Sequence, residues 1–188
     1  MSRARGSGLV ELLAGTALGL IVLGALTGAV ATGARVLAVA AGRGELEDIA
    51  HIAVECLTFD VRRAGYDPAG GGVVAVTEAF GDRVTLSAGL DGDGAVAPDS
   101  EETVAYVCAG GQLSRIVGRQ SMPVADGVSA CRLRYLDASG ASLAVPPTGL
   151  AATDRTRIRA IALDLTVSAP GLAMPTSRTT LVSLRTPP

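Results

Sequence analysis

One carboxylate, Glu11, lies near the start of a hydrophobic run that covers residues 6–34. The 23 residues at positions 12–34 carry no charged side chain. As a helix they would extend about 34 Å at about 1.5 Å per residue, which is enough to cross a bilayer. A carboxylate in hydrocarbon costs up to about 3 kcal/mol. We therefore expect Glu11 to have a function and a cationic partner.

The residues around Glu11 resemble the class III signal of type IV pilins and type II secretion pseudopilins. In that family a basic leader ends in Gly, and a dedicated peptidase cuts before a hydrophobic segment whose fifth residue is Glu. The leader here is MSRARG, so the resemblance places the cut between Gly6 and Ser7 and makes Glu11 the fifth mature residue. Ser7 departs from the usual Phe or Met, and Gly8 is a second departure. The resemblance also implies N-methylation of the new first residue.

Cleavage would create an α-amino group that is cationic at neutral pH. In a filament of this family, that amine and Glu11 of a neighbouring subunit would lie at similar depth in the membrane. Pairing in a medium of low dielectric recovers much of the desolvation cost that each charge carries alone. We therefore expect Glu11 to act as an assembly residue, which favours the addition of a subunit.

Two plainer interpretations of this segment exist. A secretory signal peptide has a shorter apolar core followed by a small-residue cleavage site, and it has no acid inside the core. A single-pass anchor fits the length of the segment but leaves Glu11 without a role. The pilin-type interpretation accounts for the leader, the length and the acid together.

Composition agrees with an exported, anchored protein. The chain of 188 residues has a formal net charge of −2, and its pI near 5.4 argues against general affinity for nucleic acid or anionic lipid. Arg3 and Arg5 precede the apolar run, which predicts a cytoplasmic N-terminus in the inner membrane. The rest of the chain would then be periplasmic, and it would later join a pilus or a pseudopilus.

Glycines recur along the apolar run. Gly15 and Gly19 lie four residues apart, as do Gly24 and Gly28, so each pair falls on one face of a helix. Small residues at this spacing allow helices to approach closely in lipid, which makes the four glycines a candidate packing seam. The alternative is that glycine is simply frequent in transmembrane helices. The sequence fits both interpretations.

A second helical pattern follows at residues 45–63. Acidic residues stand at its start and arginines at its end, matching the helix dipole. Apolar residues at spacings of three and four predict a single buried stripe. The stripe consists of Leu46, Ile49, Ile52, Ala53, Cys56 and Phe59. We expect a bend at Arg43–Gly44 and an end near Arg63, before the Gly- and Pro-rich residues 65–72.

The residues at the end of this helix indicate which members of the pilin family the chain resembles most. Residues 62–66 read Arg-Arg-Ala-Gly-Tyr, which resembles an Arg-x-Ala-Gly-Tyr motif at the end of the stem in PilW-type minor pilins; Arg63, Ala64, Gly65 and Tyr66 stand at its last four positions. The J component of type II secretion systems is a near relative with similar architecture. The resemblance implies a minor pilin or pseudopilin that initiates or caps a filament. Its partners would be the prepilin peptidase, other minor pilins, the major pilin and the inner-membrane assembly platform.

The pattern after residue 72 is rich in short strands. We predict strands at residues 73–76, 83–86, 103–108, 112–117, 130–136, 157–168 and 179–185, with a hairpin turn at residues 109–111. The expected fold is α+β, with a long N-terminal helix packed on an antiparallel sheet as in type IV pilins. Four segments follow from this: a leader at 1–6, a transmembrane helix at 7–42, an amphipathic stem at 43–66 and a β-rich head at 67–188.

The three cysteines are Cys56, Cys108 and Cys131. Cys56 lies on the predicted buried stripe and is interpreted as a small core residue. Cys108 and Cys131 fall on predicted head strands, and the periplasm permits a disulfide between them. Such a bond could contribute about 3 kcal/mol through chain entropy. Two reduced strand cysteines are the alternative.

One loop carries several acids. Asp91, Asp93, Asp99 and Glu101 are candidate ligands for Ca²⁺, because Asp-x-Asp-Gly matches part of the EF-hand loop. The match is incomplete, and a solvated acidic turn is the plainer alternative. We expect no other cofactor.

Two further function classes compete with the structural role. A filament-tip binding or adhesion module would use the head arginines, namely Arg115, Arg119, Arg132 and Arg134. A membrane-anchored enzyme would need a nucleophile–base pair or a metal cluster. His51 is the only histidine and provides neither, so we expect no enzymatic activity and assign no catalytic residue.

Overall fold

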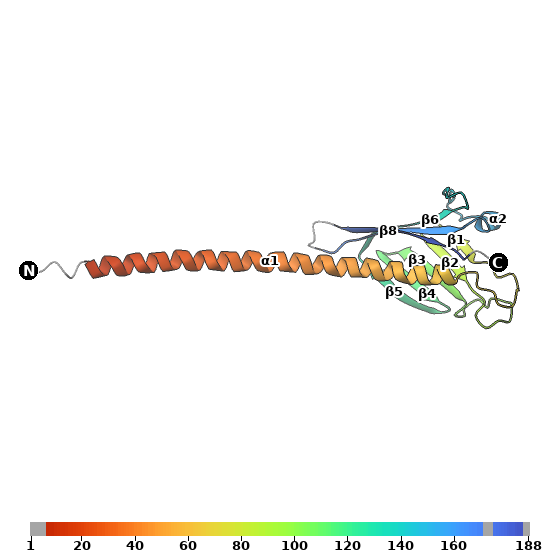
Figure 1. The fold of residues 1–188 in the computed structure, drawn as a ribbon, viewed down its shortest axis with the longest axis horizontal. Helices are drawn as coiled ribbons and strands as arrows, with labels where there is room; N and C mark the ends of the chain where they lie inside the picture. Colours follow the sequence, from red (N-terminus) through yellow and green to blue (C-terminus); the bar gives the residue numbers. More distant parts are fainter. Residues whose placement is uncertain (1–6, 171–174, 186–188) are drawn as a thin grey trace, which may run out of the picture. The chain divides into compact units, whose positions relative to one another are not determined.

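The computed structural model describes residues 7–170 and 175–185. The structure is α+β, with a long N-terminal helix and antiparallel sheets (Figure 1). Helix α1 runs from Ser7 to Arg63. The chain divides into two compact units, Met1–Gly42 and Arg43–Pro188, and α1 contributes residues to both. The helix is unbroken at Arg43 and Gly44, and the bend expected there stays a prediction from the sequence.

In the second unit, α1 buries one row of side chains, spaced at three and four residues. The row consists of Leu46, Ala50, Ala53, Leu57 and Val61, and the buried Ala64 follows directly after the helix. The predicted stripe is partly wrong, because Ile52 is 52% exposed and Phe59 is 62% exposed. Two apolar rows lie side by side on this helix. The row that contains Ala50 and Ala53 faces the strands, since small side chains allow close packing.

The helix ends at Arg63, as predicted from the sequence. Gly65 then adopts a positive φ of 74°, which residues other than glycine rarely adopt. Its amide donates a hydrogen bond to the carbonyl oxygen of Ser87 at 2.8 Å. A Cβ atom at this position would lie 3.0 Å from the Cβ of Ala75. The glycine therefore brings the helix end close to the strands.

A five-stranded antiparallel sheet follows, with the strand order β1-β2-β3-β4-β5. Its strands are β1 (Val76–Ala79), β2 (Arg83–Ser87), β3 (Thr103–Ala109), β4 (Gln112–Val117) and β5 (Gln120–Asp126). The hairpin between β3 and β4 turns at Gly110 and Gly111, which both have positive φ, in the predicted place. The prediction of a strand at residues 73–76 is wrong, because β1 begins at Val76.

A second antiparallel sheet has three strands in the order β6-β7-β8. They are β6 (Val128–Leu136), β7 (Ala160–Val167) and β8 (Thr176–Ser183), and the short helix α2 (Ala152–Arg155) precedes β7. Strand β5 and helix α2 were not predicted from the sequence. Pro123 and the exposed residues 120–123 hide the strand pattern of β5, which lies at a sheet edge where proline is tolerated.

The core of the second unit joins α1 to both sheets. Leu57 and Val61 of α1, Leu113 of the first sheet, and Leu163 and Val182 of the second belong to one buried apolar cluster. The cluster also contains two buried tyrosines, whose hydroxyls are hydrogen-bonded. The C-terminal part of α1 is therefore an integral element of this unit.

Candidate functional site

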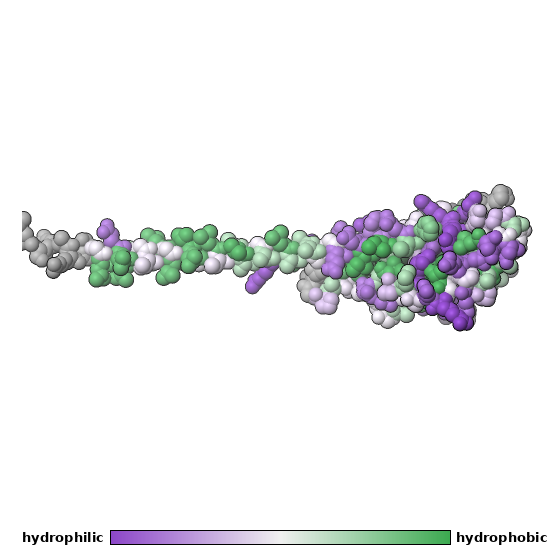
Figure 2. Space-filling view, turned by 90° about the horizontal axis from the view of Figure 1, so that it is seen from below, coloured by the Kyte–Doolittle hydropathy of each residue, from purple (hydrophilic) through white to green (hydrophobic). Residues whose placement is uncertain are grey.

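Glu11 lies one turn after the first residue of α1, in a segment where residues 8–41 are all exposed. Large apolar side chains surround it, and along the segment they range from 47% exposed at Val39 to 72% at Val30. Figure 2 shows this apolar surface. Each such side chain gains about 1.5–3 kcal/mol when it leaves water completely. The segment is therefore suited to lipid or to other helices.

Polar side chains in this segment are satisfied within the helix. The hydroxyls of Thr16 and Thr32 donate to the carbonyl oxygens of Leu13 and Gly28 at 3.0 and 2.9 Å. Such internal bonding suits a hydrocarbon environment, which offers no water. Within the described residues, α1 is the one helix long and apolar enough to cross a membrane. In this helix only Glu11 and Arg35 are charged between residues 8 and 42.

The processing residues fall at the edge of the described chain. Ser7 is the first residue of α1, and Gly6 lies outside the described residues. The four glycines of the candidate seam, Gly15, Gly19, Gly24 and Gly28, are all helical. A Cβ built on any of them meets nothing within 4 Å. The four positions are therefore open surface of this chain, and the seam stays a prediction.

A disulfide joins Cys108 at the end of β3 to Cys131 on β6. The bond links the two sheets next to a backbone hydrogen bond from the Val128 amide to the Gly111 carbonyl at 2.8 Å. Cys56 is free and half-buried, and it packs against the core. The disulfide therefore fixes the relative position of the two sheets in the second unit.

The acidic loop is organised by hydrogen bonds to its own backbone. Asp91 accepts from the amide of Asp93 at 3.0 Å, and Asp93 accepts from the amide of Ala95 at 2.8 Å. The buried carboxylate of Glu102 accepts from the amides of Leu90 and Ala97. These bonds are typical of turns that acidic residues stabilise.

The candidate calcium ligands do not converge in this loop. Asp99 pairs with Arg119 at 3.4 Å, and Glu101 is exposed. Within the described residues, no group of three or more His, Cys, Asp or Glu side chains is placed to hold a metal ion. Calcium binding by Asp91, Asp93, Asp99 and Glu101 stays a prediction from the sequence.

A buried ion pair joins α1 to the first sheet. It was not predicted from the sequence. Asp60 of α1 is 3% exposed. It accepts two hydrogen bonds from Arg115 of β4, at 2.6 Å from Nε and 3.0 Å from Nη2. The hydroxyl of Tyr106 on β3 donates a third at 2.6 Å. The available signal was the spacing of Asp60, which stands four residues after Cys56 and seven after Ala53 on the predicted stripe, where a buried carboxylate requires a partner.

The electrostatics of this trio follow from its burial. Burial raises the pKa of Tyr106 well above its usual value, and the hydrogen bond to the Asp60 carboxylate raises it further. The hydrogen bond to Asp60 also raises the pKa of Arg115. Both groups therefore stay protonated, and the trio holds a fixed charge pair.

Three of the four arginines considered for a binding face are already paired. Arg115 is bound to Asp60, and Arg119 pairs with Asp99. Arg134 of β6 donates two hydrogen bonds to Asp164 of β7, at 2.7 and 3.1 Å. The pKa of Asp164 is lowered chiefly by Arg134. Arg115 and Arg134 therefore hold structural elements together, whereas the side chain of Arg119 is 87% exposed and stays accessible to a partner.

A comparison with models of known protein families gives no match, and a comparison with curated proteins gives none. The functional interpretation of this chain therefore depends on the exposed apolar helix, the acid within it and the α+β unit that follows.

Proposed function

We propose that this chain is a minor pilin or pseudopilin, a subunit that helps to initiate or cap a filament. The observation that carries the proposal is an apolar helical segment, exposed at residues 8–41, with Glu11 near its start. The same helix continues into the α+β unit, where its last turns are part of the core. Such a chain combines an apolar segment suited to membrane or helix packing with a folded unit.

The proposed mechanism is processing followed by docking. Removal of residues 1–6 frees the amine of Ser7, four residues before Glu11. That separation is about 6 Å along a helix at about 1.5 Å per residue. A neighbouring subunit displaced by about one helical turn would bring its amine level with Glu11. The two opposite charges would then neutralise each other in a medium of low dielectric.

The proposal defines location and partners. The basic leader residues Arg3 and Arg5 favour a cytoplasmic N-terminus in the inner membrane, with residues 43–188 in the periplasm. The partners are a prepilin peptidase, the major pilin, other minor pilins and the assembly platform. Arg63, Ala64, Gly65 and Tyr66 favour a type IV pilus over a type II secretion pseudopilus.

Substitution of Glu11 tests the docking step. In cells that contain a complete assembly system, Glu11→Ala is expected to be processed normally but to enter the filament fraction at least tenfold less than the wild type. A factor of ten corresponds to about 1.4 kcal/mol, a modest part of the energy of a buried charge pair. The measurement is the ratio of the chain in sheared filaments to the chain in membranes.

Glu47→Ala is the matched control, because this exposed acid lies on α1 in the second unit. It is expected to leave the ratio unchanged. Normal incorporation of Glu11→Ala would count against the docking role. Equal loss in both variants would show that the effect is not specific to the acid in the apolar segment.

A further inference from the structure

A pocket of about 250 Å³ opens in the second unit beside the end of α1. Four separate segments contribute to its lining: Gly65, residues 73–76, residues from the end of α2 to the start of β7, and the residues after β8. Its volume is below the 300–1,000 Å³ that is typical of sites for drug-sized ligands. The pocket therefore suits a small chemical group.

Three arginines line this pocket, namely Arg155, Arg159 and Arg185. Across residues 7–170 and 175–185, none of the three forms an ion pair with a carboxylate. Arg155 donates from Nη1 to the carbonyl oxygen of Leu150 at 2.9 Å, and its buried Nε has no hydrogen-bond partner. Arg159 donates from Nη1 to the carbonyl oxygens of Thr156 and Ile158. Carbonyl oxygens neutralise no charge, so the pocket has three positive charges and a buried donor without a partner.

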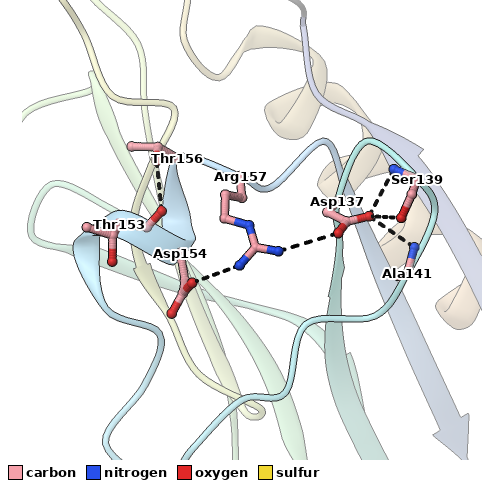
Figure 3. Close-up of polar contacts among 7 residues, drawn as sticks. All are labelled: Asp137, Ser139, Ala141, Thr153, Asp154, Thr156 and Arg157. Carbon is pink, nitrogen blue, oxygen red and sulfur yellow. Dashed lines mark hydrogen bonds and ion pairs between the residues drawn. The ribbon is translucent and has the colours of Figure 1, made fainter.

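Arg157, which lies between Arg155 and Arg159 in the sequence, has a different environment. Arg157 forms ion pairs with Asp154 at 3.2 Å and with Asp137 at 3.6 Å, and it does not line the pocket (Figure 3). Asp137 also accepts hydrogen bonds from Ser139 and from the Ala141 amide. Asp137 and Asp154 are thus paired with Arg157, and Asp137 also stabilises a turn. They hold the segment after α2 in place and leave Arg155 and Arg159 for another anion.

The third arginine is positioned by the end of the helix. The guanidinium of Arg185 lies 5.5 Å from the centre of the Tyr66 ring, which follows Gly65 at the turn after α1. A guanidinium over an aromatic face is held by a cation–π contact while its N–H groups stay free to donate. Tyr66 therefore helps to place this cation at the pocket.

The remaining wall of the pocket is aliphatic. Val74, Val76, Ile158 and Leu184 contribute to it, and Val74 is 48% exposed. Guanidinium groups bind carboxylates through paired, charge-assisted hydrogen bonds. Aliphatic walls favour an apolar group next to that carboxylate. The combination selects a carboxylate that is attached to a short aliphatic group.

We propose that this pocket binds a carboxylate carried on a short aliphatic group. Two sources have this chemistry: the C-terminal residue of a polypeptide and a free short-chain aliphatic carboxylic acid. The site is independent of Glu11 and of membrane assembly, so it goes beyond the function proposed above and can be tested separately.

The test uses the full-length, ¹⁵N-labelled chain in detergent micelles and follows the Nε–H signals of its arginines by NMR. The probes are acetyl-Ala-Ala-Leu with a free carboxylate, the same peptide as its C-terminal amide, isovalerate and inorganic phosphate. We expect a saturable shift of the Arg155 signal with the peptide acid, and at least tenfold weaker binding of the amide. Tighter binding of the peptide than of isovalerate identifies a polypeptide C-terminus as the source, and equal binding identifies the free acid. Equal binding of the amide and the acid, or binding of phosphate as tight as that of the carboxylates, would overturn the proposal.

Substitutions of the lining arginines test whether the probes bind in this pocket. Arg159→Gln combined with Arg185→Gln removes two exposed cations, so the fold should survive, and binding should weaken at least tenfold. Arg155→Gln should weaken binding similarly, with thermal melting used to check its fold. Arg178→Gln removes one exposed charge from β8, outside the pocket, and should change nothing. Wild-type affinity in the double variant would refute the site.

Discussion

Replacing Arg115 by methionine should destabilise the second unit strongly, because it leaves the Asp60 carboxylate buried without its cation. Arg115 donates two hydrogen bonds to Asp60, at 2.6 and 3.0 Å. Hydrogen bonds to a charged group contribute about 1.5–3 kcal/mol each. Removing one partner of a buried pair costs about 3–5 kcal/mol in total. We expect the free energy of unfolding to fall by about that amount.

The assay is urea unfolding of the full chain in micelles, followed by tyrosine fluorescence and circular dichroism. The expected change is a lower midpoint with an unchanged slope, since the same surface is exposed on unfolding. Arg119→Met is the matched control. Its side chain is 87% exposed and pairs with Asp99 at 3.4 Å, so its loss should cost less than about 1 kcal/mol.

A triple variant separates the charge from the packing. Asp60→Leu, Tyr106→Phe and Arg115→Met together remove both charges and the hydroxyl that would lose its partner. Replacing a buried ion pair by apolar residues of similar volume is often neutral. The triple variant should therefore recover most of the stability lost in Arg115→Met. The reasoning is refuted if Arg115→Met loses less than 1 kcal/mol, a threshold taken from exposed pairs, or if the triple variant is less stable than Arg115→Met.

Two other predictions concern the stability of the same unit. Reduction of the disulfide between Cys108 and Cys131, whose sequence separation is 23, should lower the free energy of unfolding by about 3 kcal/mol; identical melting with and without reductant would contradict this. Burial raises the pKa of both Tyr106 and Tyr135, so the folded chain keeps protons that the unfolded chain loses above about pH 10. Stability should therefore fall as pH rises beyond that value, and in Tyr66→Phe the phenolate absorbance should appear only with unfolding. Phenolate absorbance before loss of the circular dichroism signal would be inconsistent with the two buried hydroxyls.

Sequence patterns predicted the features that neighbouring residues determine. The end of α1 at Arg63 follows from the arginines of its last turn and from Gly65, which adopts a positive φ. The β3–β4 hairpin follows from Gly110 and Gly111 between two apolar runs. The α+β class follows from the change of period after the helix. Each signal lies within a few residues of the feature that it predicts.

Features that depend on tertiary packing were missed. Periodicity identified an apolar stripe on α1, but the strands selected the neighbouring row through Ala50 and Ala53 and left Ile52 and Phe59 exposed. The exposed, Pro-containing edge strand β5 gave no alternating pattern. Periodicity measures the hydrophobicity of a row, whereas the sheets also require side chains small enough for close approach.

The candidate sites also differ in whether neighbouring residues or tertiary packing determine them. Glu11 stands out from a single short motif, so the sequence is enough to select it. Asp60 and Arg115 are 55 residues apart and become partners only through the packing of α1 on β4. The arginine pocket gathers residues of four segments, and nothing in the spacing of Arg155, Arg159 and Arg185 indicates a shared site.

The central claim is that this chain is processed and assembled as a filament subunit. Its most direct test is the N-terminal sequence and intact mass of the chain, extracted from membranes of cells that contain a prepilin peptidase. The account predicts a mature chain that begins at Ser7 with a methylated amine, and a Gly6→Leu variant that keeps its leader. A wild-type chain that keeps Arg3 and Arg5, or one that begins after the apolar segment, would contradict the account.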